Sequence, residues 1–159
     1  MEVIFMVKNR SVPTDHILPH VYYENVADAL AWLTSVFGFV EDYHFNLPDG
    51  QLHGVMIHKG NAWVMLKNSG RTMTSPSRLG LQTQSLMVFV KNVDEHYRNS
   101  ISSGARILEE IFNTEYGERQ YSAQDLEGHV WTFSEHVKDV SPVSWGGKIA
   151  NERTESTKK

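Results

Sequence analysis

The eight histidines are the residues of this chain best suited to metal binding or proton transfer. Their spacing gives only a weak signal, because no His-x-His pair occurs that would place two imidazoles on the same side of a strand. We expect His20 to line a cavity or to be hydrogen-bonded in the core, and His129 to have a structural role. His96 and His136 are expected on the surface.

Most other catalytic arrangements are missing from the sequence. The absence of cysteine excludes thiolate zinc sites, a thiol nucleophile and disulfides. There is no phosphate-binding GxxxxGK[ST] loop, no GxGxxG and no Ser-His-Asp nucleophile motif, so hydrolase and nucleotide-dependent functions lack support. Arg119 has two interpretations. It can form a structural salt bridge with Glu118 or Asp125, or its guanidinium can clamp an anionic ligand.

Composition argues against several classes of partner. The net charge is -4, the isoelectric point is about 6.0, and no Lys/Arg cluster occurs, which argues against nucleic acid and anionic membranes. No apolar run approaches the ~20 residues that cross a bilayer. The first residues, MEVIFMVKNRS, lack a cleavage-type site, so we expect no signal peptide. Together with the lack of cysteine, these features favour a cytoplasmic protein.

Apolar periodicity and turn residues predict the elements that must position any site. Asn25 and Asn92 can cap the start of two helices, and Gly38 and Gly104 can end them. Strands are expected near residues 17–23, 39–46, 51–58, 62–67, 84–90, 106–111, 119–124 and 129–134, with helices after Asn25 and over 93–103.

The predicted elements occur twice in the same order, strand, helix and three strands, with an offset of about 67 residues. Such a long period indicates a duplicated module rather than a solenoid. We therefore expect an α+β fold of two tandem βαβββ modules, forming curved mixed sheets around a cleft with the helices outside. The expected division is an extension at 1–14, modules at 15–67 and 83–137, a linker at 68–82, and a polar, partly disordered tail at 138–159.

The sequence YGER at 116–119 and DLEGHVWTF at 125–133, together with the paired layout, resembles the vicinal oxygen chelate superfamily. That superfamily contains glyoxalase I, the bleomycin-resistance proteins, extradiol dioxygenases and PhnB-like proteins. The YGxR…DxxGHxWxF pattern is most similar to the bleomycin-resistance and PhnB-like branch. The resemblance implies a homodimer. One fold hosts many chemistries, so it does not itself fix the function.

The resemblance also implies where a metal would bind. Enzymes of this superfamily hold one divalent ion with His and Glu ligands from the first and last strand of each module. By pattern, these positions fall at Leu18, Met65, Ser85 and Thr132, none of which is a His or a carboxylate. Divalent metals prefer imidazole and carboxylate ligands, so we expect no metal cofactor. A register shift of two residues would make His20 the fallback ligand, with His53, His58 and Glu118 as further candidates.

Strand parity then assigns the side chains that face the cleft. This face is aromatic and apolar with few polar groups, which is typical of a small-molecule pocket, although ordinary packing between sheets remains an alternative. The opposite parity, which includes Trp131 and Phe133, is expected to pack beneath the helices. With Arg119 added, the expected ligand-binding residues are His20, Tyr22, Trp63, Met65, Ser85, Met87, Phe89, Arg119 and Thr132.

Three functions follow as hypotheses. The first is metal-independent binding of a small, partly aromatic molecule in the cleft between the modules, which requires no catalysis. The alternative is a divalent-metal-dependent lyase, isomerase or dioxygenase, in which the ion would polarise vicinal oxygens. The third is a module that binds another protein through the tail around Trp145.

Overall fold

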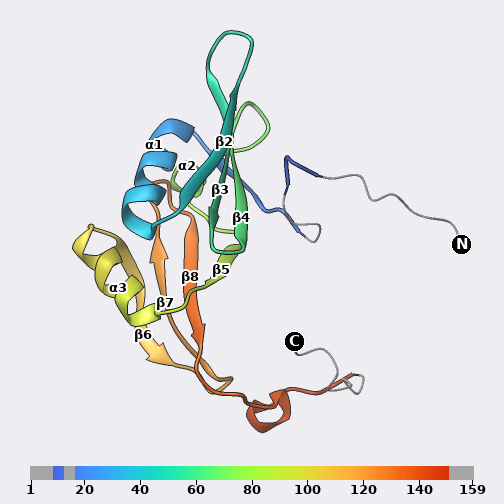
Figure 1. Cartoon of the computed structure of the whole chain (residues 1–159), viewed down its shortest axis with the longest axis vertical. Coiled ribbons are helices and arrows are strands. Elements are labelled where there is room, and N and C mark those ends of the chain that lie inside the picture. Colours follow the sequence, from blue (N-terminus) through green and yellow to red (C-terminus); the bar gives the residue numbers. More distant parts are fainter. Residues whose placement is uncertain (1–8, 13–16, 151–159) are drawn as a thin grey trace, which may run out of the picture. The chain divides into compact units, whose positions relative to one another are not determined.

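The chain forms two compact units, each built on a four-stranded mixed sheet. The first unit comprises the residues up to Thr83 together with Asp125–His129, and the second comprises Gln84–Gln124 and the residues from Val130 onward. The structure is a computed structural model and describes residues 9–12 and 17–150 (Figure 1). The expected α+β fold of two βαβββ modules is confirmed. Most of the expected N-terminal extension and the end of the tail lie outside the described residues.

The first sheet has the strand order β1-β4-β3-β2, in which β1 and β4 are parallel and the other neighbours antiparallel. One face of this sheet is covered by α1 (Figure 1). The elements of the unit are β1 (His20–Tyr23), α1 (Val26–Trp32), η1 (Leu33–Phe37), β2 (Val40–Asn46), β3 (Leu52–Lys59), β4 (Ala62–Asn68) and α2 (Pro76–Leu79).

The second sheet repeats this topology with the order β5-β8-β7-β6, and α3 packs on one of its faces. Its elements are β5 (Ser85–Phe89), α3 (Val93–Ser102), β6 (Arg106–Asn113), β7 (Glu118–Gln124), β8 (Val130–His136) and the short helix η2 (Pro142–Trp145). Among the described residues, no helix is long and apolar enough to cross a membrane.

Local sequence explains where the two main helices begin. The side-chain oxygens of Asn25 and Asn92 accept hydrogen bonds from the N–H groups of Asp28 and Glu95, at 3.0 and 3.1 Å. These bonds satisfy donors that a helix start leaves free, so both predicted caps are confirmed. The first helix widens into the π-helical turn η1 before it stops at Gly38, whose φ of +73° suits glycine.

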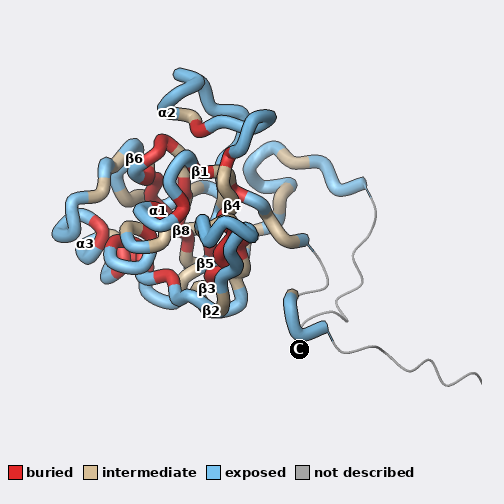
Figure 2. Tube along the Cα trace, turned by 90° about the horizontal axis from the view of Figure 1, so that it is seen from above, coloured by how far each residue is buried: buried red, intermediate tan, exposed pale blue. Residues whose placement is uncertain are grey.

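The core of each unit lies between the sheet and its helix, and the buried positions follow the strands (Figure 2). In the second unit, Trp131 and Phe133 are fully buried, which confirms that these signature aromatics belong to the core. His96 was expected on the surface, but only 9% of it is exposed. Its Nδ1 lies 2.6 Å from the hydroxyl of buried Tyr121, so a partner inside the core stabilises a polar ring there.

Candidate functional site

The face of the first sheet opposite α1 carries the most ligand-like set of side chains. Strand pairing places His20 beside Met65, Tyr22 beside Lys67, and Trp63 beside His58. The same register places Gly54 and Met56 of β3, and Tyr43 and Phe45 of β2, on this face as well. We call this surface the aromatic face and define it as His20, Tyr22, Tyr43, Phe45, Met56, His58, Trp63, Met65 and Lys67.

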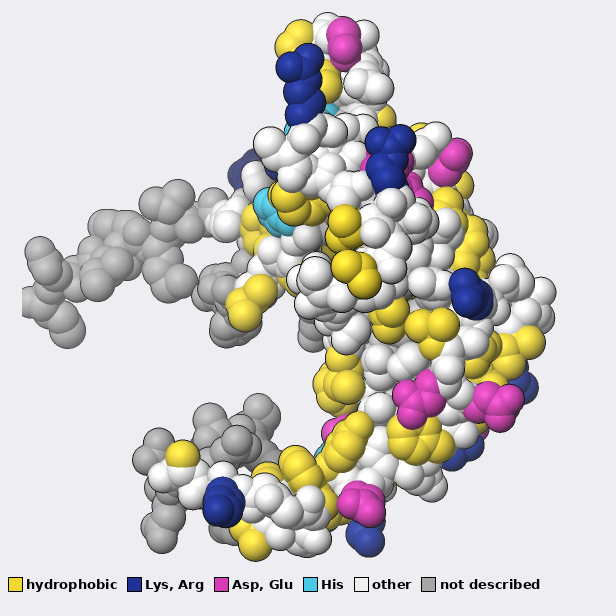
Figure 3. Space-filling view, turned by 180° about the vertical axis from the view of Figure 1, so that it is seen from behind, with side chains coloured by type: hydrophobic (Ala, Val, Ile, Leu, Met, Phe, Trp, Pro, Cys, Tyr) yellow, Lys and Arg dark blue, Asp and Glu magenta, His cyan; other side chains and the backbone are white. Residues whose placement is uncertain are grey.

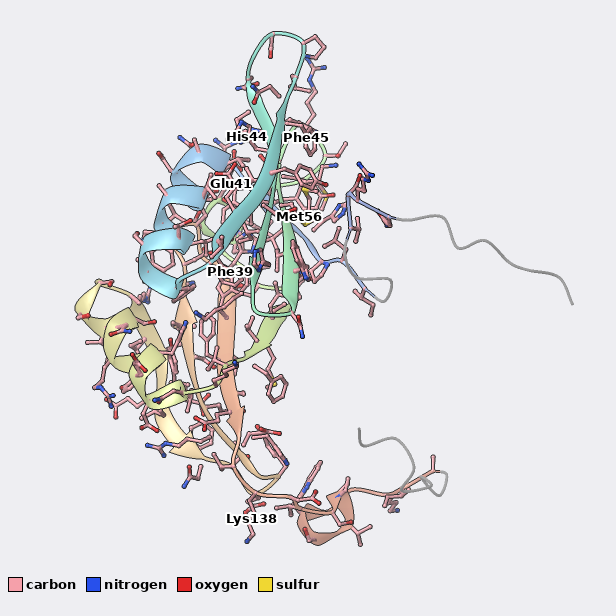
Figure 4. All side chains as sticks on the ribbon, viewed as in Figure 1. Phe39, Glu41, His44, Phe45, Met56 and Lys138 are labelled. Atoms are coloured by element: carbon pink, nitrogen blue, oxygen red, sulfur yellow. The ribbon has the colours of Figure 1, made fainter. Side chains whose placement is uncertain are left out.

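Two methionines form the buried centre of the aromatic face. Met56 is fully buried and Met65 is 7% exposed. Around them, the rings of Trp63 and His58 stack with centroids 4.4 Å apart and an interplanar angle of 23°. Phe45 and Met56 lie on the side of β2 and β3 away from Glu41 and His44 (Figure 4). Flat aromatic groups at a strand surface can stack on a flat ligand.

Glycine at position 54 shapes the aromatic face. A Cβ added there would collide with the ring of Phe45, so the ring lies directly over the Gly54 backbone. On β2, two residues before Phe45, the hydroxyl of Tyr43 donates to the carbonyl of Ser11 at 3.1 Å. This bond ties the described N-terminal segment to the same face, and hydrophobic and histidine side chains lie beside that segment in the space-filling view (Figure 3).

The face of the second sheet opposite α3 is polar at its centre. Ser122 and Thr132 bring their hydroxyls within 2.8 Å of each other, and the hydroxyl of Ser134 donates to Gln120 Oε1 at 3.1 Å. We call these four residues the hydroxyl face. On the edge strand β5, their neighbours Met87 and Phe89 expose 48% and 57% of their surface.

A carboxylate and an imidazole follow at one end of the hydroxyl face. His136 Nδ1 lies 3.0 Å from Glu118 Oε1. Within the described part of the chain, the buried Glu118 Oε2 has no hydrogen-bond partner. This oxygen therefore keeps unused capacity to accept a hydrogen bond.

The structure brings the expected ligand-binding residues onto these two faces, except for Arg119. His20, Tyr22, Trp63 and Met65 share the helix-free face of the first sheet, and Ser85, Met87, Phe89 and Thr132 share that of the second. Arg119 has the opposite parity and binds the Asp94 carboxylate through Nε and Nη2, at 2.9 and 2.8 Å. Its partner is neither of the expected acids, because α3 places Asp94 over the start of β7.

The donor atoms near the family's metal positions do not suit a divalent ion. The residue paired with Met65 is His20 rather than Leu18, and the residue paired with Thr132 is Met87 rather than Ser85. This two-residue shift supplies one imidazole, but the other donors are thioethers and a hydroxyl, which hard or borderline divalent ions bind weakly. Among the described residues, no cluster of three or more His, Cys, Asp or Glu could hold a metal.

The signature turn Asp125–His129 belongs to the first unit, where it holds β1 and α1 in place. Glu127 is 9% exposed, and its carboxylate accepts the backbone N–H groups of Glu24 and Asn25 at 2.7 and 3.0 Å. His129 Nε2 lies 2.8 Å from the carbonyl of Tyr22. The side-chain amide of Gln82 also donates to the Gly128 carbonyl. The expected structural role of His129 is confirmed.

A separate groove of about 480 Å³ lies beside the C-terminal segment of the second unit. Trp145 packs edge-on against Tyr116, with ring centroids 5.7 Å apart. Lys138, labelled in Figure 4, lines the groove. Its full lining is Asn113, Thr114, Glu115, Gly117, Val137, Lys138, Val140, Ser144 and Trp145.

The family assignment follows from comparison with known proteins. The model of the Glyoxalase/Bleomycin resistance protein/Dioxygenase superfamily matches residues 14–133. The chain belongs to this superfamily. TioX from Micromonospora sp. ML1 is 31% identical in sequence to this chain, and its crystal structure matches with a TM-score of 0.64. The match covers 78% of this chain and all of TioX.

Two further proteins are more distantly similar. An uncharacterized protein of Mycobacterium tuberculosis is 26% identical over 129 residues, which cover 77% of this chain and 75% of that protein. The genomically encoded fosfomycin resistance protein FosX from Listeria monocytogenes is 13% identical, with a TM-score of 0.56, covering 82% and 94% of the two chains. At that identity, the likeness concerns the fold alone. The narrower expectation of a PhnB-like branch stays a prediction.

Proposed function

We propose that this superfamily member binds a small, partly aromatic molecule and needs no metal to do so. The aromatic face carries the proposal, since four strands contribute rings and thioethers to one surface that none of the described helices covers. Burial of a ligand's apolar area against such a surface supplies affinity, and a few polar groups supply orientation.

Metal independence is supported by donor chemistry. His20 is the one strong donor beside Met65, and a single imidazole does not hold a divalent ion of the kind used for Lewis-acid chemistry. Binding alone is then sufficient for function, because a molecule held by the protein is unavailable to its target. The relatives' names do not decide between sequestration and catalysis for this chain.

The first experiment is a thermal-shift screen of flat aromatic compounds with the full chain in excess chelator. A ligand present at 100 times its dissociation constant adds about 2.7 kcal/mol, which raises Tm by roughly 5–10 °C for a chain of this size. Trp63→Leu should reduce the shift, whereas Trp145→Leu, outside both faces, should preserve it. Binding that appears only after a divalent ion is added would overturn metal independence, and a panel with no shifts would overturn the proposal.

We also propose that the protein forms a homodimer. Within the described sheets, β5 is an edge strand, and the exposed Met87 and Phe89 make that edge apolar. Unpaired apolar edges favour association with another chain. Light scattering coupled to size exclusion should give twice the mass of 18.2 kDa. Phe89→Lys should shift the protein to the monomer, while Ile101→Lys, an exposed change on α3, should not.

A further inference from the structure

We infer that the aromatic face selects an anionic aromatic molecule, with the Lys67 ammonium as the counter-charge. This inference rests on the proposed binding function and names the chemical class of its ligand. A planar ring system carrying a carboxylate or phenolate fits the combination of stacking surface and single cation.

Lys67 occupies the centre of one row of the sheet. It is paired with Tyr22 of β1 on one side and with Gly54 of β3 on the other. It is half-buried, and it forms no ion pair with any described residue. Lysine heads are generally placed in water or beside a carboxylate. A cation held among aromatic groups without an acidic partner is a position that an anion from outside can occupy.

The neighbour Gly54 allows an aromatic ring to lie against the β3 backbone beside Lys67. With no side chain at that position, the nearest group on the β3 side is the ring of Phe45, which lies over the Gly54 backbone. Tyr22 supplies a second ring on the β1 side. Lys67 is therefore flanked by aromatic groups, which lower the local polarity and strengthen the attraction between the ammonium and a bound anion.

The other charged and titratable side chains of the aromatic face also favour an anionic ligand. No Asp or Glu occupies a paired position on the aromatic face in the described strands. Asp42 lies in the bulge between Glu41 and Tyr43, outside the paired rows. The other titratable side chains with hydrogen-bonding nitrogen atoms are His20 and His58, each of which is neutral or positive. On a chain with net charge -4, this surface is thus suited to an anion.

The spacing along β4 sets the size of the ligand. Trp63 and Lys67 are four residues apart on one face of a strand, which separates their Cα atoms by about 13 Å. Met65, which is 7% exposed, lies between them. A molecule of two or three fused rings is long enough to stack at the Trp63–His58 end and reach the Lys67 ammonium with its acidic group. Single-ring acids are too short to use both.

The test compares three probes of matched shape: 2-naphthoate, 2-naphthamide and 2-naphthylmethylammonium. Their dissociation constants are measured by titration calorimetry with the full-length chain in chelator. We expect 2-naphthoate to bind at least ~10-fold more tightly than 2-naphthamide, because a charged hydrogen bond contributes more than a neutral one. The cationic probe should bind most weakly. Raising the salt concentration should weaken 2-naphthoate alone.

Variants assign the preference to Lys67. Lys67→Met keeps an unbranched chain without the charge and should remove the difference between 2-naphthoate and 2-naphthamide, whereas Lys67→Arg should retain it. Lys91→Met, a change at an exposed lysine of the second unit, should leave all three constants unchanged. If the neutral or cationic probe binds as well as 2-naphthoate, or Lys67→Met keeps the preference, the inference is wrong while binding itself stands. If none of the three binds, both it and the proposed function fall.

Discussion

The hydroxyl of Tyr23 donates a hydrogen bond of 2.6 Å to the carboxylate of Asp125, and both residues are buried although 102 positions separate them in sequence. Asp125 Oδ1 also accepts the backbone N–H groups of Glu127 and His129, at 3.0 Å each. The signature turn is thus fixed internally by Asp125 and is tied to β1 by Tyr23. A sequence pattern used to recognise the family is explained here by the folding of the first unit rather than by ligand chemistry.

Replacing Tyr23 by Phe should therefore destabilise the protein without altering the aromatic face. The variant leaves a buried carboxylate oxygen without its phenol donor, which costs about 1–3 kcal/mol. Urea unfolding monitored by circular dichroism measures the loss. The neighbouring Tyr22→Phe should change the free energy of unfolding much less, because no hydrogen bond of its hydroxyl is present among the described contacts. Equal losses for the two variants would contradict the importance of the Tyr23–Asp125 bond.

The carboxylate of Glu127 leads to a second prediction about the same turn. Its carboxylate accepts two N–H groups at the start of α1, where a negative charge also interacts favourably with the helix dipole. Glu127→Ala should cost roughly 2–4 kcal/mol, since two backbone donors lose a charged, buried acceptor. Glu127→Gln should cost less because the amide oxygen can still accept. Leu126→Ala, at the exposed neighbouring position, is the matched control. A cost for Glu127→Ala no greater than for Leu126→Ala would refute the capping role.

Much of the fold could be predicted because its signals are local. Asn25 and Asn92 act within one turn of helix, and Gly38 ends its helix through its own φ angle. The repeat offset of 67 is also retained in the structure. His20 pairs with Met65 in the first sheet, and the residues 67 positions later, Met87 and Thr132, pair in the second. The exact pairing was displaced by two residues from the expected positions, because distance from the helix cap does not determine where a parallel partner aligns.

The candidate site could be predicted only in part. Parity along a strand is a property of the backbone, so the sharing of one face by Tyr22, Trp63 and Met65 followed from sequence. The contacts of Arg119 and His96 depend on which helix lies above each strand, and no local pattern encodes that. His96 follows the cap Asn92 by four residues, and the apolar phase of the helix was the signal that could have placed it inward. The bulges in β2 had no marker in the sequence.

High pH should destabilise the protein through its buried tyrosines. Burial raises the pKa of Tyr121 above its ordinary value, and burial together with the Asp125 charge does the same for Tyr23. A raised pKa in the folded state means that the unfolded chain releases these protons first. The stability is therefore intact below about pH 10 and falls above it, by up to about 1.4 kcal/mol per pH unit for each tyrosine.

Comparing the pH dependence of unfolding in two tyrosine variants separates the effect of the buried tyrosines from that of other groups that titrate at alkaline pH. Unfolding free energies measured between pH 9 and 11.5 should fall less steeply for Tyr121→Phe than for the wild type. Tyr116→Phe, at a more exposed tyrosine, should keep the wild-type slope. The starting stability of Tyr121→Phe will also be lower, because the hydroxyl lies 2.7 Å from Ser100 Oγ and 2.6 Å from His96 Nδ1. Identical slopes for all three proteins would contradict the role assigned to Tyr121.

Gly117 should be the residue that fixes the C-terminal segment to the second sheet. Its carbonyl accepts the N–H groups of Val137 and Lys138, at 2.9 and 3.1 Å, and its φ is +94°. A Cβ at this position would collide with the Lys138 carbonyl. Gly117→Ala therefore adds a steric clash to the cost of about 1–2 kcal/mol for a left-handed alanine. Gly104→Ala, with φ of +86° and nothing within 4 Å of the added Cβ, measures that backbone cost alone.

Hydrogen exchange distinguishes the clash from a general loss of stability. In Gly117→Ala we expect the amides of Val137 and Lys138 to lose their protection and the Tyr116–Trp145 contact to open, which should red-shift the Trp145 fluorescence towards that of a solvent-exposed indole. In Gly104→Ala both readouts should remain as in the wild type at equal denaturant. The segment closes one side of the 480 Å³ groove, so its release would also remove that groove. Unchanged exchange at these two amides in Gly117→Ala would show that the segment is held by other contacts.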